Sequence, residues 1–417
     1  MSPTSPLRWF TFAALSLIFF VVSAGTFSSL GVVLPAMVTE LGWSWTEAGL
    51  GYTFLGLACG LASFAPAVLI RKIGVRGSMV CGTITMAAGF LAMALTQTVW
   101  LYLAATLLIG LSFALVSTVP GTHVLTDLFK NRSTALGAYF TIGALGQVAG
   151  PLFYVAIHEM TNGWRPYWYA FVGLALTAGI FAIVTTPGRH DESKHVTAAP
   201  EQAGAPEMIQ GLKDWTVRHA LATSQFYIVV AGYTTYLLIN TVAHGFAVQH
   251  LTERGVDPKA AAAMLSLEAL FGAGVSLLGG MAGERVSAKT LMILSLVALT
   301  AGMVGLAEAR SWGLMMVYVV GVGLGFGLSL LSATMLLLRY FGKKPNLELF
   351  SIMCLISTSA AIGPALGGWA RDTLGSFTLM FLVCAAFTGA MLIATVFMRA
   401  PVLPRGSELD AQPEPAA

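Results

Sequence analysis

The residue whose chemistry stands out most in this sequence is Glu268, a carboxylic acid in an otherwise apolar stretch. It is the one ionisable side chain between Ala262 and Gly283. A charged group near the middle of a lipid-spanning helix costs roughly 2.5–3.5 kcal/mol on insertion scales, and such residues face a protein interior or a water-filled cavity. Burial disfavours the charged form of a carboxyl group, so we expect Glu268 to exchange a proton near neutral pH. The alternatives are direct contact with a cationic or hydroxylated substrate, and a structural interaction, for instance with His244.

A stripe of polar side chains precedes Glu268 on another expected helix. It consists of Tyr233, Tyr236, Asn240 and His244, whose spacing of three, four and four residues puts them on one helical face. Hydroxyls, an amide and an imidazole supply hydrogen-bond donors and acceptors. We therefore expect the stripe and Glu268 to bind a small-molecule substrate. The structural alternative is that these groups bond to neighbouring helices and stabilise the bundle.

Other ionisable residues could form gates. His123 and Asp127 are four residues apart and would meet on one helical face, after a Pro120-Gly121 step that should kink the helix. Arg339 ends another apolar stretch, where it would serve as a gate or a membrane-interface anchor. Surface or gate contacts are expected of four residues at the opposite helix ends: Glu40, Glu47, Arg371 and Asp372.

The composition indicates what must position these groups. Of the 417 residues, 56% are hydrophobic and 10% are charged, with a mean hydropathy of +0.78. Soluble domains carry about 25% charged residues, so a polytopic membrane protein is the class that fits. The net charge of +3 is small, and the four cysteines show no metal-ligand spacing. We expect neither a disulfide framework nor a metal site.

Apolar runs define the expected architecture. A spanning helix needs about 20 mostly apolar residues, and twelve such runs occur: 9–37, 46–70, 77–96, 99–127, 133–158, 166–186, 221–250, 259–283, 288–307, 312–338, 348–370 and 376–398. The prediction is an all-α membrane protein of twelve transmembrane helices in two pseudo-symmetric halves. Its parts would be an N-terminal six-helix bundle at 1–190, a cytoplasmic linker at 191–219, a C-terminal six-helix bundle at 220–400 and a disordered cytoplasmic tail at 401–417.

The basic residues predict the orientation. Only five of the 22 lysines and arginines fall on one side of the expected membrane: Arg165, Arg254, Lys259, Arg310 and Arg371. The positive-inside rule therefore puts both termini in the cytoplasm. The linker is polar, with a short interfacial helix expected around Met208 to Arg218. We expect a multi-pass protein of the cell inner (plasma) membrane that acts as a monomer.

The two halves are repeats of each other. A shift of 213 residues superimposes these pairs: Gly89 on Gly302, Gly110–Leu115 on Gly323–Leu328, Gly150-Pro151 on Gly363-Pro364, and Lys72 and Arg76 on Arg285 and Lys289. The same shift pairs Glu268 with Leu55, so the acid is not part of the repeated scaffold. Two parallel six-helix halves related by an axis along the membrane normal form an architecture used for alternating access.

Several motifs carry a family resemblance. The loop Ala67-x3-Arg71-Lys72-x-Gly74-x-Arg76 is similar to the cytoplasmic loop motif of the major facilitator superfamily, with Arg71 where an acid is usual; the second-half copy starts at Gly280. The chain resembles these transporters over essentially its whole length. Within the superfamily it is most similar to the monocarboxylate carriers and oxalate–formate antiporters, through three stretches: 31–51, 129–151 and 363–381.

The resemblance implies a secondary active transporter, with a monocarboxylate or another small organic acid as the first expectation for its substrate. Those carriers hold a carboxylate with an arginine at the position of Ser276, and the antiporters add a lysine in the eleventh helix, where 352–365 has none. A transporter or exporter of a neutral or cationic molecule is the alternative. A non-transporting sensor of this fold would have the same sequence features.

Other function classes find no support in the sequence. No nucleophile–base set or metal cluster indicates an enzyme, and no phosphate-binding glycine loop indicates an ATP-driven pump. No cofactor is implied, and no basic stripe points to nucleic acid. The expected partners are a small-molecule substrate, a proton and the lipid bilayer.

Overall fold

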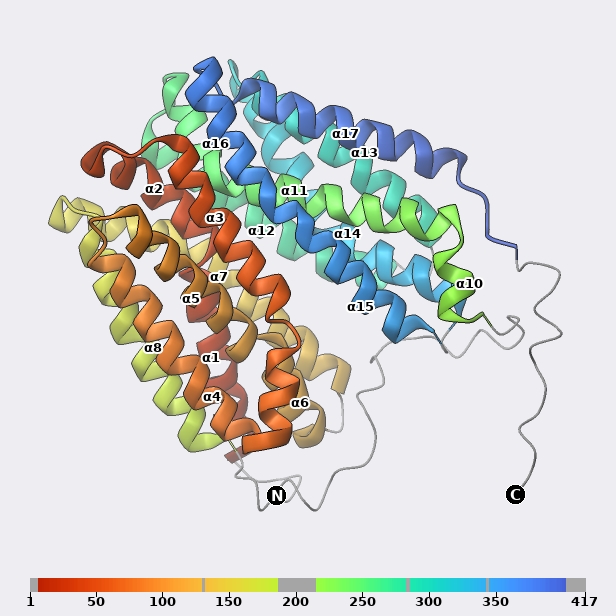
Figure 1. Ribbon diagram of the computed structural model, residues 1–417, viewed down its shortest axis with the longest axis horizontal. Coiled ribbons are helices and arrows are strands. Elements are labelled where there is room, and N and C mark those ends of the chain that lie inside the picture. Colours follow the sequence, from red (N-terminus) through yellow and green to blue (C-terminus); the bar gives the residue numbers. More distant parts are fainter. Residues whose placement is uncertain (1–6, 130–131, 187–214, 283–285, 343–344, 403–417) are drawn as a thin grey trace.

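The computed structural model describes residues 7–129, 132–186, 215–282, 286–342 and 345–402, and in these ranges the chain is helical with no strand (Figure 1). The helices of the first half are α1 (Leu7–Ala24), α2 (Phe27–Leu41), α3 (Trp45–Leu61), α4 (Ala65–Ala94), α5 (Val99–Val116), α6 (Thr118–Leu128), α7 (Arg132–Thr161) and α8 (Arg165–Thr185). Those of the second half are α10 (Val217–Leu221), α11 (Ser224–Glu253), α12 (Pro258–Ala282), α13 (Ala288–Ala307), α14 (Trp312–Phe341), α15 (Asn346–Ser357), the 3₁₀ turn η1 (Thr358–Ile362), α16 (Gly363–Leu374) and α17 (Thr378–Phe397).

Eleven segments of the described chain are long and apolar enough to cross a membrane. The expected span at 46–70 is the one missing from this set, because α3 is 17 residues long and a turn separates it from α4. The next break falls inside α4 at Gly74, whose φ of 76° leaves the helical region. This break lies in the predicted loop at 71–76, so the structure is consistent with twelve spans in two halves.

Three of the predicted spans consist of shorter helices. The first breaks at Gly25, between α1 and α2, and the fourth breaks at Ser117, between α5 and α6. The kink expected at Pro120-Gly121 therefore falls a few residues earlier, because Pro120 has no N–H to donate to the carbonyl four residues before it. The eleventh span changes to a 3₁₀ turn just before Pro364 for the same reason.

Contacts at equivalent positions confirm the 213-residue repeat. Arg76 donates to the carbonyl oxygens of Val184 and Thr186 at the end of α8, at 3.3 and 3.0 Å. Its repeat partner, Lys289, donates to two carbonyl oxygens at the end of α17, both at 2.8 Å. Cations at helix C-termini satisfy carbonyls that have no partner within the helix. Each half thus ties its third span to its sixth in the same way.

The backbone repeats at the opposite helix ends as well. Gly42 and its repeat partner Gly255 have φ of 67° and 87°, and Asn162 and its partner Gly375 have φ of 53° and 72°. Left-handed residues of this kind stop a helix and turn the chain, and glycine and asparagine adopt that conformation most readily. These residues follow the ends of α2, α11, α7 and α16, respectively. The four helix ends lie on the same side of the bundle.

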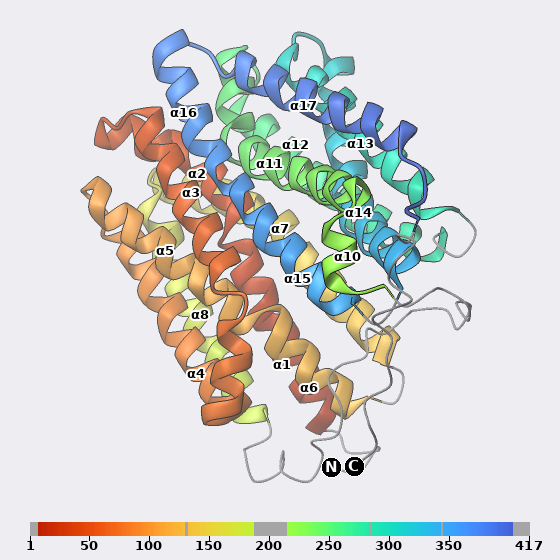
Figure 2. The same ribbon diagram turned by 45° about the vertical axis from the view of Figure 1, so that its right-hand side comes forward.

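The two halves meet on one side of the bundle and diverge toward the other. We call the side where α1 begins and α17 ends the termini side, and the opposite side the far side. On the far side α2, α3, α11 and α16 lie together, whereas α4 and α6 separate from α10 and α15 toward the termini side (Figures 1 and 2). Between the halves, α3 packs on α16 and η1, α2 on α11, and α7 on α12.

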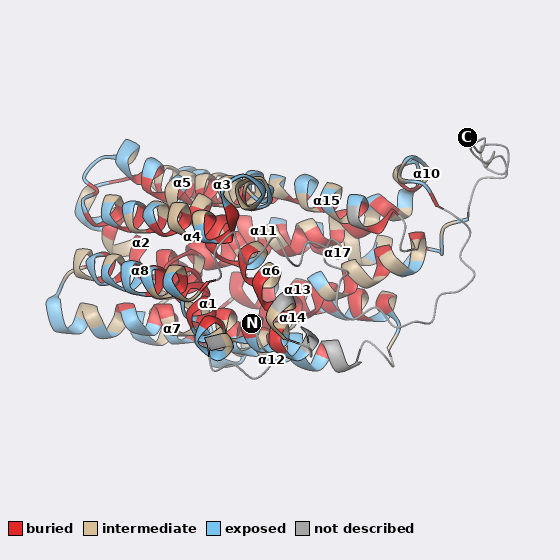
Figure 3. Cartoon of the chain, turned by 90° about the horizontal axis from the view of Figure 1, so that it is seen from below, coloured by how far each residue is buried: buried red, intermediate tan, exposed pale blue. Residues whose placement is uncertain are grey.

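Exposed residues follow the outward faces of the helices (Figure 3), and many of them are large and apolar. Trp100, Phe397 and Leu278 expose 82%, 78% and 63% of their surface, while large aromatic residues such as Trp168 are fully buried between helices. So many exposed apolar side chains suit contact with lipid rather than water. The predicted linker and tail lie almost wholly outside the described residues. Of the predicted helix at Met208 to Arg218, only residues 215–218 are described.

Candidate functional site

Glu268 faces His244 inside the second half. The His244 Nε2 atom, on α11, lies 3.5 Å from Glu268 Oε2, on α12, and the two side chains expose 1% and 0% of their surface. His244 Nδ1 lies 2.8 Å from the backbone oxygen of Asn240, which can only accept, so Nδ1 carries a hydrogen. In a neutral imidazole Nε2 is then an acceptor. The pair therefore needs one proton, either on the carboxyl group or on Nε2, to have no net charge.

Several buried polar atoms around this pair have no hydrogen-bond partner among the described residues: both carboxyl oxygens of Glu268, His244 Nε2, Asn240 Nδ2 and the Tyr318 hydroxyl. Tyr236 and Tyr318 lie close enough to Glu268 to interact with it electrostatically. More than nine in ten buried polar groups in proteins are paired. A cluster of unpaired groups at one place is therefore expensive for stability and indicates a function. The unpaired atoms belong to Asn240, His244, Glu268 and Tyr318. We call these four residues, together with Tyr236, the polar cluster.

A glycine contact fixes the backbone under Glu268. A Cβ on Gly323 of α14 would lie 2.8 Å from the Glu268 carbonyl oxygen, so only glycine allows this approach. In the first half Gly110 packs in the same way on the carbonyl of Leu55. The two backbones are equivalent, and the side chain alone differs. The acid is therefore an addition to a repeated scaffold, as the sequence predicted.

His244 also lies at the contact between the halves. A Cβ on Gly31 of α2 would overlap the His244 carbonyl oxygen. The Tyr52 hydroxyl, on α3, lies 2.5 Å from the Phe27 carbonyl oxygen and 3.2 Å from that of His244. Because the 213-residue shift pairs Gly31 with His244 itself, this contact lies where the pseudo-symmetry axis passes between α2 and α11. The ionisable pair is thus directly connected to the contact surface between the halves.

The predicted stripe contacts α14 through Tyr236. The Tyr236 ring lies 5.9 Å from that of Phe326 and 5.8 Å from that of Tyr233, and both tyrosines are 8% exposed. Tyr236, Asn240 and His244 therefore share the face that meets Glu268, and Tyr233 continues it. The role of these four residues in substrate binding stays a prediction.

The predicted gate residues lie away from the polar cluster. His123 is half-buried in α6, and the side chain of Asp127 is outside the described residues, so their predicted contact is not described either. Arg339 is exposed in the last turn of α14, on the termini side. Ser276, where the resembling carriers have an arginine, donates to the Gly327 carbonyl oxygen at 3.3 Å and so faces α14.

Some residues of this region were not found from the sequence. Tyr318 and Tyr52 lie in no quoted motif, and Gly31 only begins the stretch 31–51; the fold alone brings the three residues next to Glu268 and His244. The 213-residue register could have paired Gly31 with His244, since the residues on the axis between two repeats are repeat partners.

The chain belongs to the Major Facilitator Superfamily. The model of that family matches residues 15–250 and residues 231–416. The protein is therefore a transporter of this superfamily by family and fold, with many apolar membrane-spanning helices.

The relatives and solved structures that are similar to this chain include transporters of several kinds. Monocarboxylate transporter 11 of Homo sapiens is 26% identical over 87% of this chain and 84% of its own length. Multidrug resistance protein MdtG of Serratia proteamaculans (strain 568) is 25% identical over 51% of this chain, which spans 54% of that protein.

Among solved structures, the nucleoside transporter NupG has a TM-score of 0.71 at 13% identity, covering 94% of this chain and 98% of its own. A bacterial homolog of the human lysosomal transporter Spinster, in an inward-facing and unoccupied conformation, has a TM-score of 0.68 at 15% identity, covering 94% and 95%. These similarities extend over nearly the whole fold.

Proposed function

We propose that this protein is a secondary active transporter that moves a small organic solute by alternating access and couples that movement to a proton held by Glu268 and His244. The observation that carries the proposal is the fully buried pair, 3.5 Å apart, whose carboxyl oxygens and Nε2 have no other partner among the described residues. An ionised carboxylate alone in such a place would cost several kcal/mol. One shared proton removes that cost, so proton binding and the conformation of the site depend on each other.

Movement of the two halves relative to each other links proton binding to the conformation of the site. Gly31 and Tyr52 of the first half contact the His244 backbone, and the His244 side chain meets Glu268. When the halves rock, α11 changes its contact with α2, and the surroundings of His244 change with it. A ligand or proton shifts a two-state equilibrium only through different affinity for the two states. The pair meets this requirement if its proton is held more tightly in one state than in the other.

For the substrate we propose a monocarboxylate or another small organic acid. The likeness to monocarboxylate transporter 11 over most of both chains supports it. A neutral or cationic solute is the alternative, favoured by Ser276 at the position of the carriers' arginine and by the carboxyl group of Glu268.

We further propose that both termini are cytoplasmic, in the plasma membrane. The conformation described here, with the halves meeting on the far side, would then face the cytoplasm. The fold similarity to an inward-facing transporter supports this orientation of the open side.

Solute counterflow in proteoliposomes tests the transport function. Liposomes holding the purified protein are preloaded with one candidate from a panel of monocarboxylates, dicarboxylates, amines and nucleosides, and entry of the labelled form is followed. We expect transient accumulation with at least one monocarboxylate and none in protein-free liposomes. If a solute stabilises the protein thermally but no panel member exchanges, the protein is a sensor rather than a transporter.

The same assay tests the stripe on α11. We expect Asn240→Ala to raise the concentration for half-maximal counterflow about tenfold, since a lost hydrogen bond to a buried group costs roughly 1–3 kcal/mol. Tyr236→Phe should have a smaller effect of the same sign. Unchanged values for both variants would assign these side chains to packing.

A further inference from the structure

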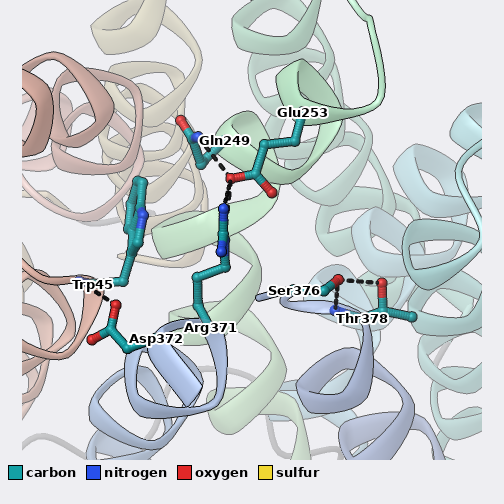
Figure 4. Close-up of polar contacts among 7 residues, drawn as sticks. All are labelled: Trp45, Gln249, Glu253, Arg371, Asp372, Ser376 and Thr378. Carbon is teal, nitrogen blue, oxygen red and sulfur yellow. Dashed lines mark hydrogen bonds and ion pairs between the residues drawn. The ribbon is translucent and has the colours of Figure 1, made fainter. Parts of the chain in front are cut away.

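An acid of the second half caps a helix of the first half on the far side. Asp372, on α16, accepts hydrogen bonds from the backbone N–H groups of Trp45 and Thr46 at 3.0 and 2.7 Å, and from the Thr46 hydroxyl at 2.5 Å. Trp45 and Thr46 are the first two residues of α3, and Figure 4 shows the Asp372 carboxylate directed at the Trp45 backbone. The first N–H groups of a helix have no partner within the helix and attract negative charge.

The surroundings of Asp372 hold it in this position. Arg371, its neighbour, donates to Glu253 of α11 at 2.8 Å, which fixes the end of α16 to its own half (Figure 4). Trp45 packs edge-on against Phe246 and Phe377 of the second half, at 6.1 and 5.3 Å between ring centroids. The contact is therefore built from both halves.

A second acid makes the equivalent contact in the opposite direction. Glu159, at the end of α7 in the first half, forms an ion pair with Lys259, the second residue of α12. The 213-residue shift pairs Glu159 with Asp372 and Lys259 with Thr46. The two contacts between the halves are thus repeat partners, one on each side of the pseudo-symmetry axis.

The helix caps explain why the two contacts differ chemically. At α12, Asp257 caps its own helix by accepting from the N–H groups of Lys259 and Ala260 at 2.9 and 3.2 Å, so the opposing acid meets a lysine side chain instead. At α3, Ser44 and Glu47 form a capping box that uses the N–H groups of Glu47 and Ser44. The N–H groups of Trp45 and Thr46 are left for Asp372.

We propose that Asp372 and Glu159 are paired positioning residues that hold the far side of the transport pathway closed. When the far side opens, each acid must leave a helix start on the other half, so both contacts favour the state in which the halves meet there. Asp372 contributes more, because it accepts three charge-assisted hydrogen bonds. Glu159 and Lys259 are 49% and 62% exposed, and exposed ion pairs contribute little. The inference uses the proposed alternating access but not the proposed proton coupling.

Hydrogen–deuterium exchange of the full chain in lipid nanodiscs tests the proposal. We expect Asp372→Asn to shift the ratio of far-side-open to far-side-closed molecules by roughly 5- to 30-fold toward opening. Exchange should rise at the start of α12, residues 258–263, which Asp372 does not touch. It should fall on the termini side, in α6 and at the start of α15. Local loss of a cap would change only the start of α3, and general destabilisation would raise exchange on both sides.

Four further variants test whether the effect belongs to the Asp372 and Glu159 carboxylates. Asp372→Glu, which keeps the carboxylate, should restore most of the wild-type pattern. Glu159→Gln should shift the ratio in the same direction by less than about fivefold, and the double variant should shift it more than either single one. Glu308→Gln removes an equally exposed acid on the far side that pairs within its own loop, with Arg310, and should leave exchange as in the wild type.

The proposal requires that Asp372→Asn raises exchange on the far side and lowers exchange on the termini side. If Asp372→Asn leaves residues 258–263 unchanged, or raises exchange on both sides, Asp372 does not hold the far side closed. Failure of Glu268 variants to affect proton coupling would leave this result untouched, so the two proposals fail separately.

Discussion

Glu268→Gln is expected to abolish solute accumulation driven by a proton gradient while leaving solute exchange across the membrane in place. The amide has nearly the same shape as the protonated carboxyl group and can still donate to His244 Nε2, but it cannot release a proton. Replacing one buried hydrogen-bonding group by another should change stability by no more than about 1–2 kcal/mol. The measurement compares uptake under an imposed proton gradient with counterflow at equal pH, in the same proteoliposomes.

Two further variants are compared with Glu268→Gln in the same two assays. Glu308→Gln removes an acid from the far-side surface and should behave as the wild type in both assays. His244→Gln should reproduce the uncoupled behaviour, because it removes the other proton acceptor of the pair. If Glu268→Gln accumulates solute against its gradient as well as the wild type does, Glu268 is not the coupling residue.

Much of the architecture could be predicted because membrane insertion imposes strong patterns. Apolar runs of sufficient length give the spans, and the shared register gave the repeat that Arg76 and Lys289 confirm through their matching helix-end contacts. The exact breaks could not be predicted. Pro120 marks the fourth span as irregular, but whether the helix breaks there or at Ser117 depends on how neighbouring helices cover the freed carbonyl groups.

The site could be predicted only in part, for a related reason. Glu268 is visible from sequence because a buried acid is costly in any membrane fold, and its contact with His244 followed as one alternative. The Tyr318 hydroxyl gave no such signal, since tyrosine is ordinary in a transmembrane helix. Asp372 was predicted only as a surface or gate contact, and no prediction was made for Glu159. Their partners are a helix start and a lysine in the other half, which no local pattern specifies.

Gly31→Ala is expected to disfavour the conformation described here and to slow transport strongly. The added Cβ would overlap the His244 carbonyl oxygen, which belongs to the backbone of α11 and cannot rotate away. Overpacking a close contact costs typically 1–3 kcal/mol, a shift of about 5- to 150-fold in a two-state equilibrium. Helices α2 and α11 would separate, so exchange should rise on the far side, at 258–263, and counterflow should slow.

Gly173→Ala provides the matched control, because a Cβ on Gly173 of α8 would meet no atom within 4 Å. It makes the same chemical change in a helix of the same half and should transport as the wild type does. Gly31 of α2 and His244 of α11 are repeat partners and contact each other. Gly31→Ala therefore disrupts the contact between the halves at the pseudo-symmetry axis. Wild-type counterflow and exchange in Gly31→Ala would mean that α2 and α11 need not come this close during transport, and would remove the proposed link between the moving halves and the Glu268–His244 pair.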